Sequence, residues 1–301
     1  MSALTKIAIV GATGNLGPAI LQQVVNARFD VTVLTRKSSS HTFPASVKVV
    51  EVDYESLDSV TDALRGQDAV VSTIGSAALS KQLLLVEAAA KAGVKRFLPS
   101  EFGSDTVHPK VSKLPSFGDK IAVQEALKSE AARAGGMTYT LVITGPFLDW
   151  GMRVGFLANV KARKITTWDG GNEVFSSTTL ESIGRAVAGV LRHPAETENR
   201  AVYVQDTALA PTQLLEIAKR VVGSEGWEVT DNSLSDHVAK AWEELAKPNP
   251  NPANWAFNFI IQSIAGEGYG AKFEKLDNEL LGVKEFSEAD IEALIRRLAA
   301  E

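Results

Sequence analysis

The sequence contains no cysteine among its 301 residues, which excludes disulfide bonds, thiolate metal sites and a cysteine nucleophile. It has no excess of positive charge either, since the formal net charge is −5, and nucleic-acid binding needs a basic face. No apolar run approaches the roughly 20 residues that a membrane helix requires. No basic stretch with a signal-length apolar run opens the chain. We therefore expect a cytoplasmic protein with no nucleic-acid or membrane partner.

The first half alternates short β-branched runs with amphipathic helical patterns. This alternation is typical of a parallel sheet covered by helices on both faces, with right-handed crossovers. The fold class that we predict is α/β with a doubly wound parallel sheet. The predicted strands are 4–10, 31–35, 47–52, 69–72, 95–98 and 138–143, and the predicted helices are 17–26, 56–64, 79–92 and 117–134.

The rhythm changes after about residue 145. Residues 145–175 look irregular around one short strand at 164–168, and a helix (179–192) and a strand (201–204) are expected to return to the first sheet. Proline and asparagine at 247–252 predict a break. Further helices are predicted at 211–222, 233–246, 253–264 and 287–299. We expect a first domain at 1–150 together with 176–206, and a smaller, mostly helical substrate-binding domain at 151–175 and 207–301.

Three glycines follow the first predicted strand at a spacing of three, and a helix follows them at once. In a dinucleotide-binding (Rossmann) fold, Gly11 permits the tight turn, Gly14 lets the backbone approach a pyrophosphate, and Gly17 lets the helix pack closely. The helix N-terminus adds free N–H donors and a partial positive charge. The same loop supplies three further candidate cofactor-binding residues, Thr13, Asn15 and Leu16.

The end of the second strand distinguishes NAD from NADP. It carries no acidic residue for a ribose hydroxyl, but Arg36 and Lys37 offer positive charge, and Thr35 and Ser38 offer hydroxyl donors for a phosphate. We therefore predict NADP(H), the alternative being a solvated surface loop. Asp53, after the third strand, is a candidate adenine contact, and the start of a turn is the favoured reading.

The chain resembles the NmrA-like, isoflavone-reductase-like branch of atypical short-chain dehydrogenases, which includes phenylcoumaran benzylic ether reductases. Three segments carry the resemblance: Gly11–Gly17, the run Val94-Lys-Arg-Phe-Leu-Pro-Ser-Glu-Phe-Gly103, and Lys120 at the start of the next helix. The resemblance implies NADPH as hydride donor, a reducible aromatic or conjugated substrate, and catalysis centred on Lys120. Some members carry histidine after Ser-Glu-Phe-Gly, where this chain has Ser104.

The Tyr-x-x-x-Lys pair of ordinary short-chain dehydrogenases is absent. None of the four tyrosines has a lysine four residues later, and Ser116 stands four residues before Lys120. Lys120 is therefore the candidate general acid or base. Ser116 and Asp119 predict a helix start, so that Lys120 lies in the first turn. There the helix dipole and an oxidised nicotinamide would lower the pKa of the lysine. The alternative is an ordinary surface lysine.

Loops after the later strands complete the predicted cofactor site, because ligands of such sheets bind at the carboxyl ends of the strands. Within them, Glu101 is favoured as a structural carboxylate over a catalytic one. The resemblance places the loop after strand 138–143 beside the nicotinamide. The candidate residues are Thr73, Ile74, Gly75, Ser100, Glu101, Phe102, Pro146 and Phe147.

Aromatic and apolar residues beyond that loop suit an aromatic substrate. The candidates are Trp150, Met152, Phe156 and Trp168, for each of which an interdomain core is an equal alternative. His108 is a further candidate on the substrate side, although its neighbour Pro109 also suits a plain turn, which is the favoured reading. The four histidines show no ligand-like spacing, so no metal site is predicted. Self-association, for instance as a homodimer, is left open.

Two functions from different classes fit these residues. The first is an NADPH-dependent reductase that transfers hydride to an enone, carbonyl, imine or benzylic ether, with Lys120 protonating or stabilising the oxyanion. The second is a regulatory protein that senses NADP(H) without catalysis. A fold recruited for isomerisation or cyclisation is a third possibility. The missing tyrosine favours the sensor, whereas Lys120 and the Pro-Ser-Glu-Phe-Gly run favour the reductase, which we expect.

Overall fold

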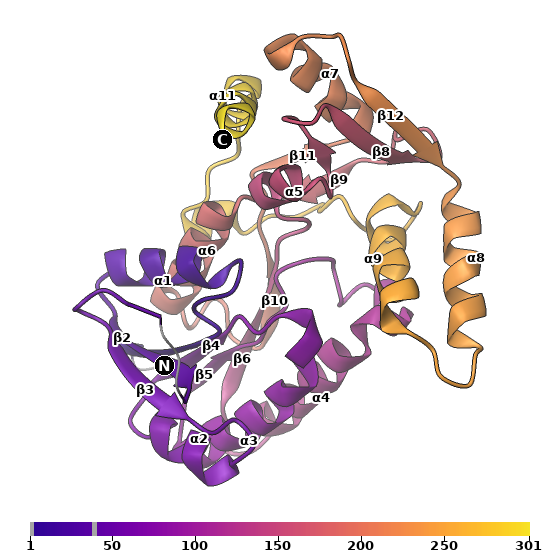
Figure 1. Ribbon diagram of the computed structural model, residues 1–301. Helices are drawn as coiled ribbons and strands as arrows, with labels where there is room; N and C mark the ends of the chain where they lie inside the picture. Colours follow the sequence, from indigo (N-terminus) through magenta and orange to yellow (C-terminus); the bar gives the residue numbers. More distant parts are fainter. Residues whose placement is uncertain (1–2, 38–40) are drawn as a thin grey trace.

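A seven-stranded parallel sheet forms the centre of the computed structural model, which describes residues 3–37 and 41–301 (Figure 1). Every pairing in this sheet is parallel. Its strands, in spatial order, are β10 (Arg200–Tyr203), β6 (Thr138–Ile143), β5 (Arg96–Leu98), β4 (Ala69–Ser72), β1 (Lys6–Val10), β2 (Asp30–Arg36) and β3 (Lys48–Val52). The order reverses between β1 and β4, which is the switch point where ligands of such sheets bind.

Helices cover both faces of this sheet, so the predicted doubly wound fold is confirmed. Alternate residues of β1 separate the two cores: Ile7 and Ile9 lie in one, Ala8 and Val10 in the other. The first core packs against α1 (Gly17–Asn26) and α6 (Leu180–Arg192). The second packs against α2 (Leu57–Leu64), α3 (Gln82–Ala92) and α4 (Gly118–Ala131).

The remaining elements gather beyond the carboxyl ends of the strands, at the top and right of Figure 1. They include a three-stranded sheet of β12 (Glu228–Asn232), β8 (Lys164–Trp168) and β7 (Ala158–Asn159), and a pair of β11 (Thr207–Leu209) with β9 (Phe175–Ser177). The helices are α5 (Leu148–Val154), α7 (Pro211–Val222), α8 (Leu234–Leu245), α9 (Ala256–Ala265) and α11 (Glu288–Ala300). The short helix α10 (Asn278–Leu281) instead packs against α6 in the first core of the large sheet. Short 3₁₀ helices are η1 (Ser76–Lys81), η2 (Val111–Lys113), η3 (Pro115–Phe117) and η4 (Pro252–Asn254).

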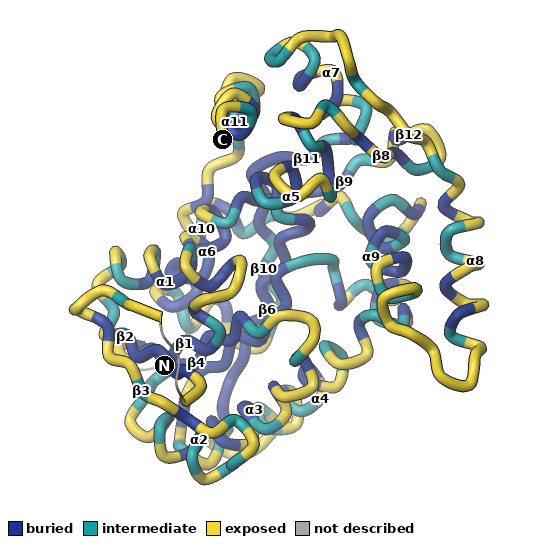
Figure 2. The backbone as a smooth tube through the Cα atoms, viewed as in Figure 1, coloured by how far each residue is buried: buried dark blue, intermediate teal, exposed yellow. Residues whose placement is uncertain are grey.

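A separate apolar core holds many of these elements together, whereas α8 packs against α9 in another small cluster. The separate core joins buried side chains of α5, β8, α7, α9 and α11, such as Met152, Ile165 and Ile295. Figure 2 shows the central strands β1, β4 and β6 largely buried, whereas much of the edge strand β3 and the outer sides of α8 and α11 are exposed. None of the helices in the described part of the chain is both long and apolar enough to cross a membrane.

Most predicted elements are present, with ends that differ by a few residues, and the break at 247–252 lies between α8 and η4. The prediction was wrong to treat 145–175 as irregular around one strand. It missed α5 because Gly151 interrupts that pattern; a Cβ there would lie 2.9 Å from Leu157, so close packing requires the glycine. It missed β12 because this strand is exposed and polar, and only its pairing with β8 defines it.

Candidate functional site

A cleft of about 510 Å³ lies at the carboxyl ends of β1, β4, β5 and β6. Loops that follow these four strands form one side of it, and α4, α5 and α9 contribute the rest. Among the predicted residues, those that line the cleft are Gly14, Asn15, Leu16, Thr73, Ile74, Gly75, Ser100, Glu101, Phe102, Lys120, Pro146, Phe147, Trp150 and Phe156. Segments more than a hundred residues apart in the sequence thus meet at one site.

The glycine loop has the geometry that a pyrophosphate requires. Gly11 has a φ of +84°, and a Cβ there would lie 2.8 Å from the carbonyl oxygen of Thr73. A Cβ on Gly17 would lie 2.3 Å from the carbonyl oxygen of Gly11, so only glycine allows α1 to pack this closely. At Gly14 the nearest atom to such a Cβ is 3.5 Å away. This glycine therefore leaves room on the cleft side, where a phosphate would approach.

The N-terminus of α1 is left free to bind an anion. Its N-cap residue is Leu16, whose side chain makes no capping hydrogen bond, and no acidic side chain occupies the first turn. Backbone N–H groups of the first turn have no partner within a helix. Together with the helix dipole they form a ready site for negative charge. The residues present therefore fit the pyrophosphate of a dinucleotide.

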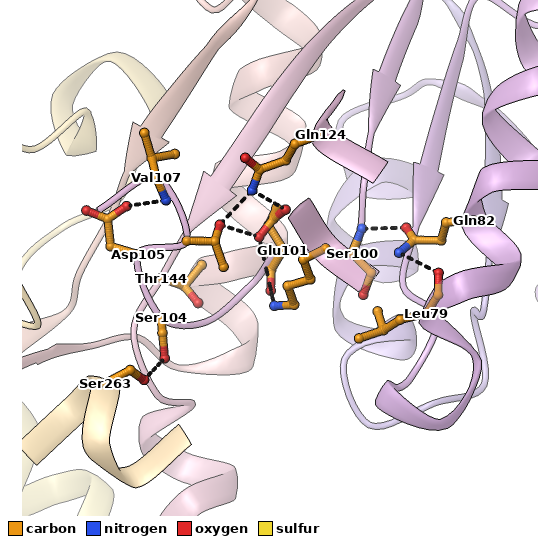
Figure 3. A network of polar contacts seen from close by, with 12 residues as sticks. Leu79, Gln82, Ser100, Glu101, Ser104, Asp105, Val107, Gln124, Thr144 and Ser263 are labelled. Carbon is orange, nitrogen blue, oxygen red and sulfur yellow. Dashed lines mark hydrogen bonds and ion pairs between the residues drawn. The ribbon is translucent and has the colours of Figure 1, made fainter. Parts of the chain in front are cut away.

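The loops after β4 and β5 are fastened to each other beside this anion site. Ser100 donates from its Oγ to the carbonyl oxygen of Ile74 at 2.8 Å, and its backbone N–H donates to Oε1 of Gln82 at 2.8 Å (Figure 3). Thr73 donates from its Oγ1 to the carbonyl oxygen of Val10 at 2.9 Å. These bonds fix the cleft wall before any ligand binds.

Lys120 and Glu101 form the polar centre of the cleft. The Nζ of Lys120 donates to the backbone carbonyl oxygen of Glu101 and lies 3.9 Å from Oε2 of the same residue. The Glu101 side chain is 1 % exposed and accepts hydrogen bonds from Thr106 Oγ1 at 2.8 Å and Gln124 Nε2 at 2.9 Å. Figure 3 shows Gln124 and Glu101 pointing toward each other. Glu101 thus ties the loop after β5 to α4, as its structural reading predicted.

Burial lowers the pKa of Lys120 below its ordinary value, and the charge of Glu101 opposes this effect. The direction agrees with the prediction from sequence, although that prediction relied on the helix dipole and the cofactor. The Lys120 side chain is 13 % exposed, so its amine faces the cleft with little water around it. A lysine whose pKa is lowered in this way gives up its proton more readily than a lysine in water.

The predicted role of Ser116 at the start of α4 was wrong. Its Oγ donates to the carbonyl oxygen of Ala256 at 2.6 Å, and the N-cap residue is Phe117. Ser116 therefore connects the start of α4 to α9. Lys120 nevertheless lies in the first turn of α4, which spans Gly118–Ala131, as the sequence predicted.

The structure does not bring Arg36 and Lys37 to the cleft wall. Both are exposed at the carboxyl end of β2, on the edge where the glycine loop also lies. Ser38, predicted as a hydroxyl donor to the phosphate, lies outside the described residues. Asp53 accepts a hydrogen bond from the backbone N–H of Glu55 at 3.0 Å and so begins a turn, which was its favoured reading.

The predicted substrate residues separate into two groups. Trp150 and Phe156 line the cleft, and Trp150 packs edge-on against Phe147 with ring centroids 6.1 Å apart. Met152 is fully buried in the apolar core of α5, α7 and α11 and does not line the cleft. Trp168 lies on β8 and lines a neighbouring pocket.

His108 lies in a turn, as its alternative reading predicted. Its backbone N–H donates to the carbonyl oxygen of Asp105 at 3.1 Å, and its Nδ1 accepts from the backbone N–H of Lys110 at 3.3 Å. It is absent from the cleft wall of the described residues. Among residues 3–37 and 41–301, no group of three His, Cys, Asp or Glu side chains is placed to hold a metal ion.

Sequence reasoning missed the cleft residues that come from α9 and from the start of α4. Ile260 and Ile264 of α9 line the cleft, as does Phe117, which stands three residues before Lys120 in the sequence. The apolar run of α9 predicted a helix but gave no indication of its neighbours. Ser104 also lines the cleft, and its Oγ lies 2.7 Å from Oγ of Ser263 on α9. Of these missed residues, only Phe117 is close to Lys120 in the sequence, directly before α4.

Fold and cleft define the class of the protein: a doubly wound α/β protein in which a glycine loop and a buried lysine share one cleft. The model of the NmrA-like family matches residues 4–241. Oxidoreductase poxI of Penicillium oxalicum is 32% identical over 306 residues, covering 97% of this chain and 94% of that protein. Oxidoreductase aprR of Aspergillus flavus is 36% identical over 286 residues, covering 92% and 94%. The chain belongs to the NmrA-like family and is an oxidoreductase.

Solved structures share the fold over the full length of the chain. AtPrR2 with NADP⁺ and (+)-pinoresinol has a TM-score of 0.76 at 22% identity, covering 99% of this chain and 100% of that one. A structure from the set of pinoresinol-lariciresinol and phenylcoumaran benzylic ether reductases has a TM-score of 0.79 at 22% identity. The match covers 98% of this chain and 99% of that one. The family match and the curated relatives, together with this shared fold, confirm the resemblance that three short segments indicated.

Proposed function

We propose that this protein is an NADPH-dependent reductase of small aromatic or conjugated substrates in which Lys120 acts on the developing oxyanion. The observation that carries the proposal is the position of the Lys120 amine, 13 % exposed, in the same cleft as the anion-binding glycine loop. The AtPrR2 structure, which holds NADP⁺ and (+)-pinoresinol, supports both ligand classes.

The cofactor half of the cleft would hold NADP(H). Gly11, Gly14 and Gly17 with the N-terminus of α1 would bind the pyrophosphate, and Arg36 with Lys37 would meet the additional phosphate on the ribose. NADPH supplies the hydride when it is bound. We assign this role to residues 1–150 with 176–206, and substrate binding to 151–175 and 207–301. In support, β10 pairs with β6, and α5, α7 and α11 share their own core.

The role proposed for Lys120 follows from charge. Addition of hydride to an electron-poor carbon moves an electron pair onto the oxygen atom conjugated with it. A protonated Lys120 amine stabilises that oxygen or transfers a proton to it, which leaves a neutral product and a neutral amine. The carbonyl oxygen of Glu101 accepts one of the amine hydrogens and orients the others. Solvent returns the proton once the product has left.

The substrate half of the cleft is apolar. Its walls include the aromatic rings of Phe117, Phe147, Trp150 and Phe156 together with Ile260. Such walls favour a flat aromatic or conjugated ring and exclude water from the developing charge. No charged side chain other than those of Lys120 and Glu101 lines the cleft in the described part of the chain. A neutral substrate is therefore the expected class.

The alternative is a non-catalytic NADP(H)-sensing regulator. No tyrosine lines the cleft among the described residues. Tyr203, for example, does not line the cleft. Its hydroxyl donates to Oδ1 of Asp105, and the two oxygen atoms are 3.2 Å apart. The protein thus lacks the usual proton donor of short-chain dehydrogenases, which favours a sensor if Lys120 proves dispensable.

The deciding experiment measures NADPH oxidation with a panel of enones, quinones and phenolic ethers. Lys120→Met should lower kcat by about 10²- to 10⁴-fold, while Lys120→Arg should keep part of the activity. Lys113→Met is the matched control, because Lys113 is exposed at the end of η2 and does not line the cleft. Tight NADPH binding without turnover of any compound would favour the sensor. Full activity of Lys120→Met would overturn the proposed role of the lysine.

A further inference from the structure

A narrow pocket of about 40 Å³ adjoins the cleft on its substrate side. We call it the inner pocket. Residues from four separate elements line it, among them Trp168 on β8, Phe175 on β9, Leu214 on α7 and Ile261 on α9. Phe156 and Ile264 line both the inner pocket and the cleft, so these two side chains form the wall between them.

The lining of the inner pocket is mainly apolar. Its one charged residue among those described is Glu173, which is exposed, as is Thr166. Both therefore lie toward solvent, whereas Leu214 is 3 % exposed and Phe175 6 % exposed. A charged or strongly polar group would lose its hydration here without gaining partners. An apolar group would be favoured by the area it removes from water.

The wall between cleft and pocket is built so that a side chain can open it. The backbone at Phe156 is fixed, since its N–H donates to the carbonyl oxygen of Gly151 at 2.8 Å. Its ring is half-buried and packs edge-on against Phe257, with centroids 5.4 Å apart, and Phe257 is itself 48% exposed. The ring also packs against the apolar core of α5, α7 and α11, so opening the wall requires the ring to leave part of that packing as well as Phe257.

We propose that the inner pocket binds an uncharged alkyl or alkenyl arm of the substrate, about three or four carbon atoms long, while the reducible group stays beside Lys120. The size follows from the volume, since roughly 10–15 Å³ measured in this way holds one water-sized group. The proposal rests on the proposed function, because it assumes that the substrate occupies the cleft. It names the substrate class as a conjugated ring with a short apolar arm.

The first test uses one enone scaffold that carries straight alkyl arms of zero to six carbons. The kcat/KM with NADPH should rise about fourfold for each carbon, as expected from the transfer of one methylene out of water. The rise should stop at three or four carbons. Phe156→Ala should move that limit to longer arms because it merges cleft and pocket. A kcat/KM independent of arm length would overturn the proposal and leave the reductase function intact.

A filled pocket gives the complementary result. Leu214→Phe should abolish the gain from the arm without lowering kcat/KM for the compound that has none. Leu215→Phe is the matched control, since Leu215 is buried in the same core but does not line the inner pocket. Ala265→Leu fills the pocket from α9 with a smaller change, in case Leu214→Phe folds poorly. Equal arm dependence in wild type, Leu214→Phe and Ala265→Leu would contradict the proposal.

A binding measurement separates this proposal from the reductase function. With NADP⁺, which has no hydride to give, the same series cannot be reduced, but its members should bind more tightly as the arm lengthens to three or four carbons. The binding should change the tryptophan fluorescence, and Trp168→Phe should remove the part of the change that depends on the arm, because Trp168 lines the pocket while Trp150 lines the cleft. Arm-dependent binding without any turnover would retain the pocket and reject the reductase. An affinity that does not vary with the arm would reject the pocket.

Discussion

The Lys120 amine donates a hydrogen bond to the backbone carbonyl of Glu101, while the carboxylate of the same residue lies 3.9 Å away and makes its own bonds to Thr106 and Gln124. One residue thus holds the amine by its backbone and tunes it by its side-chain charge. The next residue in the sequence, Phe102, has a left-handed backbone with a φ of +34°. Strain of this kind occurs where surrounding structure enforces a functional geometry.

The pH profile should reveal this tuning. Burial lowers the pKa of Lys120 and the charge of Glu101 raises it. If the protonated amine is the active form, kcat falls as the pH rises through that pKa. Glu101→Gln removes the opposing charge, so the alkaline limb of the kcat profile should move to lower pH. Thr106→Val keeps the charge and should leave the limb in place. An unchanged limb in Glu101→Gln would show that the carboxylate only holds the loop.

The three glycines of the loop should separate stability from cofactor binding. Gly17→Ala places a Cβ 2.3 Å from the carbonyl oxygen of Gly11, so the free energy of unfolding should fall by about 1 to 3 kcal/mol. Gly14→Ala meets nothing closer than 3.5 Å and should fold normally, but its methyl group should weaken NADPH binding. Urea denaturation and NADPH titration measure the two effects. Normal NADPH affinity of Gly14→Ala would place the pyrophosphate elsewhere.

Preference for NADPH should depend on Arg36. Arg36→Ala removes a charge-assisted pair with the ribose phosphate, so NADPH affinity should fall about 10- to 100-fold while NADH affinity stays constant. Lys48→Ala removes the same charge from the opposite end of the neighbouring strand, since Lys48 pairs with Thr32 and Arg36 with Val52. Calorimetric titration with both cofactors measures the effect. Equal wild-type affinity for NADPH and NADH would refute the phosphate assignment.

Buried Arg96 should be essential for stability. It is 0% exposed and donates to Thr138 at 2.8 Å, Thr140 at 2.9 Å and Thr197 at 3.1 Å, which joins β5 to β6 and to the segment before β10. Burial lowers its pKa to about 10, yet the guanidinium stays charged at neutral pH. Arg96→Met should cost at least about 3 kcal/mol of unfolding free energy.

A surface arginine provides the control for that measurement. Arg65 pairs with Asp62 on α2, and both side chains are about two-thirds exposed, at 67% and 70%. Arg65→Met should therefore change the free energy of unfolding by less than about 0.5 kcal/mol. Similar losses in the two variants would mean that the buried network contributes no more than an exposed pair.

How far the sequence could predict the site depends on how local each signal is. The glycine loop and the strands β1, β4 and β6 were identified because their patterns are contiguous and apolar. Lys120 was identified through a sequence motif and not through its burial. Its burial depends on Glu101 and the loop after β5. That burial could not be read from the sequence around the lysine.

Long-range contacts account for the errors. Ser116 has the sequence pattern of an N-cap, but its hydroxyl donates to the carbonyl of Ala256, 140 positions away. Met152 was predicted to contact the substrate because its side chain is apolar. Helix α5 instead directs Met152 into the core, while Trp150 lines the cleft. The contribution of α9 was invisible for the same reason. No pattern within Ala256–Ala265 indicates which cleft the helix will face.

The contact between Ser104 and Ser263 should couple the cleft loop to α9. Ser263 donates to the carbonyl of Ile260 at 2.7 Å, so Ser104 supplies the proton of the 2.7 Å contact between the two hydroxyls. In a double-mutant cycle, Ser104→Ala and Ser263→Ala should show a coupling of about 0.5 to 1.5 kcal/mol. Either variant should raise KM for the substrate and leave the Kd for NADPH unchanged, because α9 lines only the substrate half. Additive effects on stability together with an unchanged KM would show that the two hydroxyls do not hold the cleft closed.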